Sequence, residues 1–461
     1  MKMALNGKLL QYVVFCAGSF SMLQCGLHIG WPSPSLPQLL SNTSTLLVSN
    51  DEGSTIASMF LFGDVFSALL TIPLVDLIGR KNMLLFTCLP FCASWLLIAY
   101  GQSIWELYVA RLIAGISDGV VFFCLPLYLA EISNFKVRGF FISGTIVTYL
   151  LGVFLANLFG TYFNITKVAF AYAILSFLTI FFYLIIPESP QFYIIRRKND
   201  EGKMAMARFN GEDNIELSFN LMHNSIMEQK SNNTKWRQMI TDPHNCRSIG
   251  LMIALRMFQQ FSGFLGITFY IQTLFIKADK YVSPIVFVTI YYLLQTVGSL
   301  VNAAVIDKLG RKPLLLTSWF LIICGLSLET VYYALEKLYI FNEGDYSWLP
   351  ILGLFVFIVG YTIGLQNIPI VLTGEMFPLH FKAVSTGIIN FAYGITGVIA
   401  SKYFQYTKDN FGLYVPFLTF TIFSICGLGF SFFYLPETKR KTLEEIQKTL
   451  TNKQTSNLLD N

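Results

Sequence analysis

The chain has 461 residues, of which 54% are hydrophobic and only 13% are charged, and its formal net charge at pH 7 is +5. Because a soluble globular protein carries about twice that charged fraction, the composition excludes an ordinary soluble domain and indicates a membrane protein. The small net charge says little about partners, and no stretch resembles a nucleic-acid-binding module.

Twelve apolar segments follow one another along the chain, each near the length of about 20 residues that a helix needs to cross a bilayer. They cover residues 9–30, 54–77, 82–100, 106–130, 139–162, 167–187, 248–276, 283–306, 312–335, 347–373, 382–403 and 412–435. The first segment lacks a cleavable signal pattern and is read as a membrane span. The sequence therefore predicts an all-α multi-pass membrane protein with twelve transmembrane helices.

The basic residues predict the orientation of these helices. With a cytoplasmic N-terminus, the inner loops and both tails hold about three quarters of the 32 Lys and Arg residues, which places both termini in the cytoplasm. Asn42 and Asn164 begin glycosylation sequons in the outer loops, so both are candidate glycosylation sites. Asn232 begins a sequon on the inner side, where it should stay unmodified.

Three pairs of short motifs recur in the same order, each pair separated by about 230 to 250 residues. The pairs are DLIGRK (76–81) with DKLGRK (307–312), EISNFKVRG (131–139) with EMFPLHFKA (375–383), and PESP (187–190) with PETK (436–439). The repeat predicts two six-helix halves in parallel orientation, an internal symmetry typical of transporters.

The same pattern suggests the domain organisation. The expected parts are an N-terminal half over 1–190, a polar cytoplasmic linker with short helices over 191–247, a C-terminal half over 248–435 and a cytoplasmic tail over 436–461.

Together with GLHIGWPSP (26–34), ARLIAGISDG (110–119) and RMFQQFSG (256–263), these motifs resemble the sugar porter family of the major facilitator superfamily. The likeness covers nearly the whole chain, and within the family it is greatest to the insect facilitated trehalose and glucose transporters. The resemblance implies the major facilitator fold and facilitated transport of trehalose or a hexose by alternating access, without a cofactor or a metal. It also implies a plasma-membrane location, a monomer, and a sugar and the lipid bilayer as the partners.

The resemblance assigns the charged motifs to a cytoplasmic gate. In the family, such acids and arginines form ion-pair networks across the two halves or between helices of one half, and they close the inner side while the outer side is open. Since a surface ion pair contributes only about 0–1 kcal/mol, such a network can open again. The alternative is that they are ordinary charges of inner loops. The expected gate residues are Asp76, Arg80, Lys81, Glu131, Arg138, Glu188, Asp307, Arg311, Lys312, Glu375 and Glu437.

Polar side chains inside the membrane are expected to face a cavity or another helix. Gln259, Gln260 and Asn390 match sugar-contacting residues of the family, and Gln295 stands where the family has an asparagine. A single helix over 248–276 would place Tyr270 on the same face as Gln259, so Tyr270 joins this candidate substrate site. Packing between helices is the alternative role for each of these residues.

Two further positions depart from the cavity of the family. Leu265 replaces an asparagine of helix 7, and Ile370 replaces a tryptophan in the break of helix 10, where Gln366 and Asn367 offer replacement contacts. The sequence therefore leaves the carried sugar open.

His28 stands where proton-coupled members of the family carry an acid. It could relay a proton, line the sugar cavity, or pair with a neighbouring helix, and it is kept with the candidate substrate residues. Asp64 and Asp118 are further intramembrane acids, expected to form hydrogen bonds between helices. Proton–sugar symport and a sugar sensor with little transport remain alternatives. No constellation favours an enzyme, and no P-loop is present.

Overall fold

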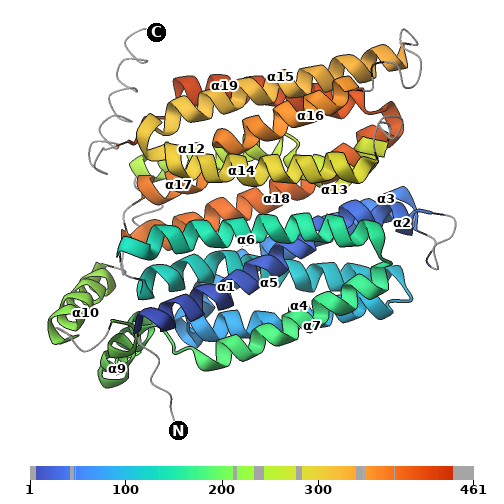
Figure 1. The fold of residues 1–461 in the computed structure, drawn as a ribbon. Helices are drawn as coiled ribbons and strands as arrows, with labels where there is room; N and C mark the ends of the chain where they lie inside the picture. Colours follow the sequence, from blue (N-terminus) through green and yellow to red (C-terminus); the bar gives the residue numbers. More distant parts are fainter. Residues whose placement is uncertain are drawn as a thin grey trace, which may run out of the picture. The chain divides into compact units, whose positions relative to one another are not determined.

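The computed structural model describes residues 7–41, 46, 48–133, 135–210, 215–232, 243–276, 283–338, 346, 348–377 and 379–439. Within these ranges the chain forms helices joined by short connections and no strand (Figure 1). Of the expected sites, Asn42 lies outside the described residues, as does most of the C-terminal tail. The side chains of Arg138 and Asp307 also lie outside them.

Eleven helical segments of the described chain are long and apolar enough to cross a membrane by length and composition. They are Leu9–Leu39, Asn50–Ile78, Arg80–Tyr100, Ile104–Ile132, Gly139–Tyr162, Ile165–Ile185, Pro284–Ile306, Arg311–Lys337, Trp348–Met376, Val384–Phe411 and Tyr414–Phe433. Eleven of the twelve expected spans are thus confirmed. The first is longer than expected because α2 (Pro32–Leu39) continues α1 (Gly7–Gly30), and proline is favoured in the first turn of a helix.

The chain divides into two units, Met1–Val48 with Met59–Thr234, and Ser49–Ser58 with Lys235–Asn461. The remaining helices of the first unit are α3 (Asn50–Ile78, whose first residues belong to the second unit), α4 (Arg80–Tyr100), α5 (Ile104–Ile132), α6 (Phe135–Tyr162), α7 (Ile165–Ile185), α8 (Pro190–Ile195), α9 (Asn199–Asn210) and α10 (Ile215–Asn232). In this unit α1 packs along α6, and α4 packs against α5 and α7. Gly26 permits the close approach of α1 to α6, since a Cβ there would lie 2.0 Å from the carbonyl oxygen of Tyr149.

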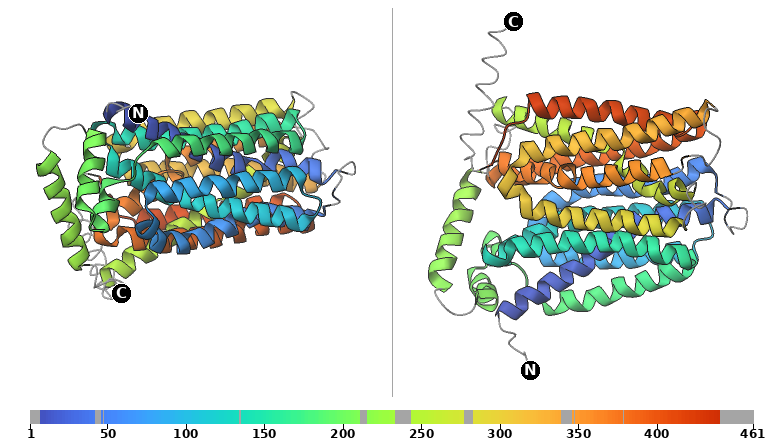
Figure 2. Two further views of the ribbon diagram at one scale, coloured as in Figure 1. Left: turned by 90° about the horizontal axis from the view of Figure 1, so that it is seen from below. Right: turned by 45° about the horizontal axis from the view of Figure 1, so that its top comes forward.

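The polar stretch after α7 is helical. Figure 2 shows α9 and α10 beside one end of the long helices of the first unit. Ile194, Met206, Phe219 and Ile226 form a small apolar cluster that joins α8, α9 and α10. These short helices therefore pack through one apolar face each, as amphipathic helices do.

The second unit contains α12 (Pro243–Gln260), α13 (Phe264–Ile276), α14 (Pro284–Leu309), α15 (Arg311–Lys337), α16 (Trp348–Gly360), η2 (Tyr361–Leu365), α17 (Ile368–Met376), α18 (Leu379–Phe411) and α19 (Tyr414–Phe433). Here α15 packs against α16 and α19, and α12 packs against α18.

The expectation of one continuous helix over 248–276 is wrong. A turn at 261–263 separates α12 from α13. Gly263 has φ +85°, and a Cβ at this position would lie 2.2 Å from the ring of Phe420. The chain can therefore change direction here only because residue 263 has no side chain.

The span Trp348–Met376 is also interrupted. A π-helical segment, η2, follows α16, and Pro369 lies in the first turn of α17. The Ser318 hydroxyl on α15 donates to the carbonyl of Gly360 at 2.7 Å and accepts from the N–H of Leu365 at 2.9 Å. One side chain thus satisfies two backbone groups freed by the break, which a membrane span requires.

Candidate functional site

Arg80 is the centre of a charged network in the first unit. Its Nε donates to Oε1 of Glu131 at 3.1 Å, and these two side chains are only 5% and 3% exposed. Its Nη1 lies 2.9 Å from Oδ1 of Asp76 and 3.3 Å from the carbonyl oxygen of Val75. A guanidinium so deeply buried requires its partners, because removing one would leave an uncompensated charge.

Glu188 connects the same network to the start of α4. Its carboxylate accepts from the N–H groups of Lys81 at 3.0 Å and Asn82 at 3.3 Å. These are among the N–H groups that a helix start leaves without partners, and a carboxylate there is also favoured by the helix dipole. The neighbouring Ser189 hydroxyl donates to Glu131. Lys81 therefore contributes through its backbone.

The second unit repeats the arrangement. Nη2 of Arg311 lies 2.7 Å from Oε1 of Glu375, and the Thr438 hydroxyl donates to Glu375 at 2.6 Å. Glu437 accepts from the N–H groups of Arg311 at 3.1 Å and Lys312 at 2.9 Å. Burial alone would raise the pKa of Glu437, but hydrogen bonds from backbone N–H groups, including those of Lys439 and Arg311, hold this pKa below its ordinary value.

The two networks correspond residue by residue. Arg80, Glu131, Glu188 and Ser189 hold the places of Arg311, Glu375, Glu437 and Thr438, respectively. The sequence predicted the charged members. The two hydroxyls belong to the repeated PESP and PETK motifs, but no role was predicted for them.

The glycine of each repeated hexapeptide also has a structural reason. Gly79 and Gly310 have φ +103° and +96°. A Cβ on Gly79 would lie 2.3 Å from Oε2 of Glu188, and one on Gly310 would lie 2.8 Å from Oε2 of Glu437. Any other residue would be strained at these positions and would displace the carboxylate.

Two expected substrate residues lie at the end of α12. Gln259 is 2% exposed, and its Nε2 donates to the carbonyl of Leu365 at 2.8 Å and to the Tyr361 hydroxyl at 3.3 Å. Nε2 of Gln260 donates to the carbonyl of Tyr393 on α18 at 3.1 Å. The paired glutamines thus connect the end of α12 to the interrupted span on one side and to α18 on the other.

A polar chain runs from α14 to the same interruption. Nε2 of Gln295 lies 3.4 Å from Oε1 of Gln366, and Nδ2 of Asn367 lies 3.1 Å from Oδ1 of Asn302. Oε1 of Gln295 is buried without a donor among the described residues. This acceptor remains available to a hydroxyl group.

Not every expected substrate residue belongs to the polar set around the interrupted span. Tyr270 lies on α13, beyond the turn, with its ring 5.5 Å from that of Phe404. Asn390 is half-buried on α18. Of the departures from the family, Leu265 is buried, whereas the side chain of Ile370 is 51% exposed on α17.

His28 belongs to the first unit, where it is fully buried. Its ring stacks on Trp95 with the centroids 3.8 Å apart, and Arg111 donates to its backbone carbonyl at 2.7 Å. Neither ring nitrogen has a hydrogen-bond partner within the described part of the chain. The stacking partner was missed because a tryptophan in an apolar segment carries no signal of such a role.

Further polar groups escaped the sequence analysis in the second unit. Glu329 on α15 is fully buried, with its carboxylate 2.6 Å from the position a Cβ would take on Gly353. A pocket near the end of α18, described below, gathers Lys402, Gln405 and Asp409. Their spacing along one helix could have indicated a common face.

Comparison with known proteins connects these features to a family. The family described as "Sugar (and other) transporter" matches residues 13–450. Among curated relatives, the facilitated trehalose transporter Tret1 of Bombyx mori is 26% identical over 96% of this chain and 87% of its own length. Tret1 of Apis mellifera ligustica is 27% identical over 95% of this chain and 88% of its own length.

Solved structures show the same fold. The inward-open xylose transporter XylE from E. coli superposes with a TM-score of 0.79 at 17% identity, covering 95% of this chain and 99% of that one. The XylE structure described as a major facilitator proton:xylose symporter bound to 6-bromo-6-deoxy-D-glucose has a TM-score of 0.77 at 18% identity, covering 96% and 100%. The fold is therefore the all-α major facilitator fold. With its family match extending over nearly all of its length, the chain belongs to the sugar transporter family, whose members are membrane transporters and not enzymes.

Proposed function

We propose that this protein carries trehalose or a hexose across the plasma membrane by facilitated diffusion. The observation that carries the proposal is the polar set of the second unit, Gln259, Gln260 and Gln295, gathered around the interrupted span. Amides offer both donors and acceptors, which suits the paired hydroxyls of a sugar. The curated relatives, described as facilitated trehalose transporters, support the choice of substrate.

Alternating access requires that one side of the protein closes while the other opens. We assign closure of the cytoplasmic side to the two charged networks, one of which lies in each unit. Each network pairs an arginine with a glutamate, so it is specific in geometry yet made of interactions that can separate. The motifs that form the two networks occur in the same order along the sequence, which supports this assignment.

The proposed orientation has both termini in the cytoplasm. Asn164 is exposed between α6 and α7, as an N-glycosylation site in an outer loop must be. We propose that it carries a glycan, and that the protein works as a monomer. Glycosidase treatment should increase the electrophoretic mobility of the wild type, whereas Asn164→Gln should reduce or abolish that increase.

Uniport is favoured over proton coupling by the surroundings of His28. Its ring stacks on aromatic groups, with centroid distances of 3.8 Å to Trp95 and 5.3 Å to Phe91, and no described residue forms a hydrogen bond with either ring nitrogen. A proton relay needs a partner that accepts the proton. Transport is therefore expected to proceed without a proton gradient.

Uptake of labelled trehalose, glucose and fructose into cells that express the chain tests the proposal. We expect saturable uptake of at least one of these sugars, equal with and without an imposed pH gradient. Gln260→Leu should reduce that uptake, while Gln102→Leu, an exchange in the connection between α4 and α5, should not. Surface expression without uptake of any of the three sugars would contradict the proposal.

A further inference from the structure

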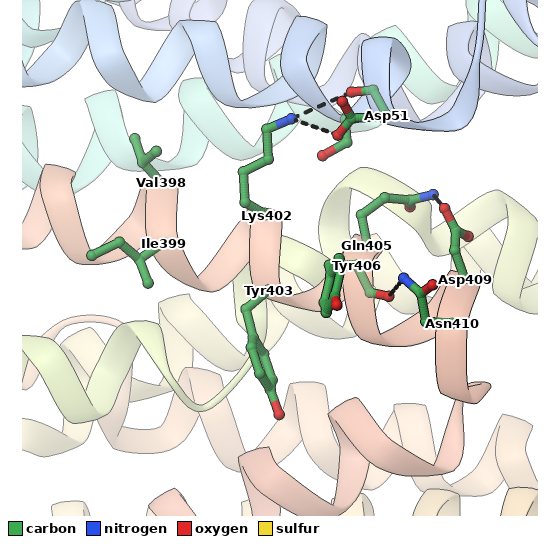
Figure 3. A pocket seen from close by; sticks show the side chains of 10 residues that line it. Asp51, Val398, Ile399, Lys402, Tyr403, Gln405, Tyr406, Asp409 and Asn410 are labelled. Carbon is green, nitrogen blue, oxygen red and sulfur yellow. Dashed lines mark hydrogen bonds and ion pairs between the residues drawn. The ribbon is translucent and has the colours of Figure 1, made fainter.

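The second unit contains a pocket of about 630 Å³ that none of the expected substrate or gate residues lines (Figure 3). It is formed by the last turns of α18 and the first turn of α3. Val398, Lys402, Gln405 and Asp409 follow one another at helical spacing, so one face of α18 forms its wall. The volume falls within the range of about 300–1,000 Å³ that is typical of small-molecule sites.

The charges of this pocket are already paired. Nζ of Lys402 lies 3.2 Å from Oδ1 of Asp51 and 2.5 Å from the Thr55 hydroxyl. Asp409 accepts from Nε2 of Gln405 at 2.6 Å, and its other oxygen lies 3.9 Å from Nζ of Lys408. Because each charged group has an opposite or polar partner, the lining favours a neutral ligand over an ion.

Gln405 supplies an acceptor that nothing in the described chain satisfies. Gln405 is 3% exposed, and its Nε2 donates to the Asp409 carboxylate, so the planar amide holds Oε1 in a fixed position. That oxygen has no donor among the described residues. A buried acceptor without a partner is energetically unfavourable, so a ligand that brings an O–H donor would be stabilised there.

The rest of the lining is amphipathic. Tyr403 and Tyr406 project from α18 beside the polar groups, and Val398 and Ile399 form an apolar part of the wall (Figure 3). Sugars present hydroxyls at their rims and C–H groups on their faces. Tyrosine rings and aliphatic side chains suit the faces, while carboxylates and amides suit the hydroxyls.

We propose that this pocket is a second sugar-binding subsite, which takes a neutral mono- or disaccharide with a hydroxyl on Oε1 of Gln405. α18 begins at Leu379, shortly after Glu375 of the charged network, and ends at Phe411, so the pocket lies near the end of α18 remote from that network. The inference rests on the proposed function for the class of ligand. It adds a place, distinct from the glutamines of α12, where the carried sugar is held.

Protection of an introduced thiol tests the subsite directly. Asn410 is exposed and lines the pocket, whereas the next residue, Phe411, is 49% exposed and does not. The full-length variants N410C and F411C in lipid nanodiscs would be treated with a water-soluble maleimide, with labelling read for each peptide by mass spectrometry. Trehalose and glucose are the probes, and betaine at equal concentration controls for a general solute effect.

We expect one of the sugars to slow labelling of N410C several-fold, with no effect on F411C and none from betaine. Adding Gln405→Leu, which keeps the volume and removes the acceptor, should abolish the protection. Unprotected N410C in a protein that still takes up the sugar would overturn the subsite, as would equal protection of F411C. Protection that persists with Gln405→Leu would overturn the role given to this side chain. Protection in a protein without uptake would support the subsite and contradict the proposed transport.

Discussion

The stability of the charged networks depends on how deeply each of their residues is buried. Arg80 and Glu131 are 5% and 3% exposed as side chains, while Asp76, the other carboxylate on Arg80, is 55% exposed. The sequence predicted all three as gate residues but gave no order of importance, because burial is a property of packing. The structure makes Glu131 the essential partner and Asp76 an accessory one.

Glu131→Ala should therefore destabilise the protein by about 3–5 kcal/mol, because it leaves a buried guanidinium without its main counter-charge. Asp76→Ala removes a carboxylate that is 55% exposed and leaves the Glu131 pair in place, so it should cost at most about 1 kcal/mol. The unfolding midpoints of the purified proteins in one detergent compare the two. Equal midpoints for both variants would mean that burial of the Arg80–Glu131 pair does not add to the stability of the protein.

Gly79→Ala tests whether the same network requires a glycine beside the Glu188 carboxylate. The positive φ and the nearby Glu188 carboxylate should make this variant less stable by about 1–2 kcal/mol. Gly139→Ala is the matched control, since a Cβ there meets nothing within 4 Å and alanine favours the helix of α6. The account fails here if both exchanges shift the melting temperature in the same direction by the same amount.

Among the elements, two expected spans contain a break, and hydropathy could not show it. The apolar content of 248–276 and 347–373 is continuous, whereas the turn at Gly263 and the π-helical segment η2 depend on contacts with other helices. The second break was expected from the resemblance to the family, and Pro369 lies in it. The other spans were predictable because length and apolar content alone determine them.

Ser318→Ala should reveal how the second break is supported. It removes the donor to Gly360 and the acceptor for Leu365, so two buried backbone groups lose a partner at a cost of about 1–3 kcal/mol. Thr317→Ala on the same helix is the control, because among the described residues the Thr317 hydroxyl donates only to the carbonyl of Leu314 in its own helix. Thermal unfolding compares them, and a control that is as unstable as Ser318→Ala would contradict this role.

For the whole molecule, the order of the motifs predicted the family and the paired networks, since three repeated pairs restrict the architecture strongly. The substrate site was less predictable. Gln259 and Gln260 bond the backbone around the interrupted span and α18, and Tyr270 lies beyond a turn that no periodicity indicated. The pocket on α18 was not predicted, because its polar residues match no motif in the sequence. Asp51, which is far from them in the chain, comes to lie beside them only in the folded structure.

The central claim is that the protein exchanges a sugar by alternating access without an external energy source. Counterflow in proteoliposomes measures this directly. Vesicles preloaded with unlabelled trehalose or glucose, and diluted into a trace of the labelled sugar without a pH gradient, should accumulate label transiently above its equilibrium level. Label that rises only to equilibrium with both sugars, at the rate of protein-free vesicles, would contradict the account.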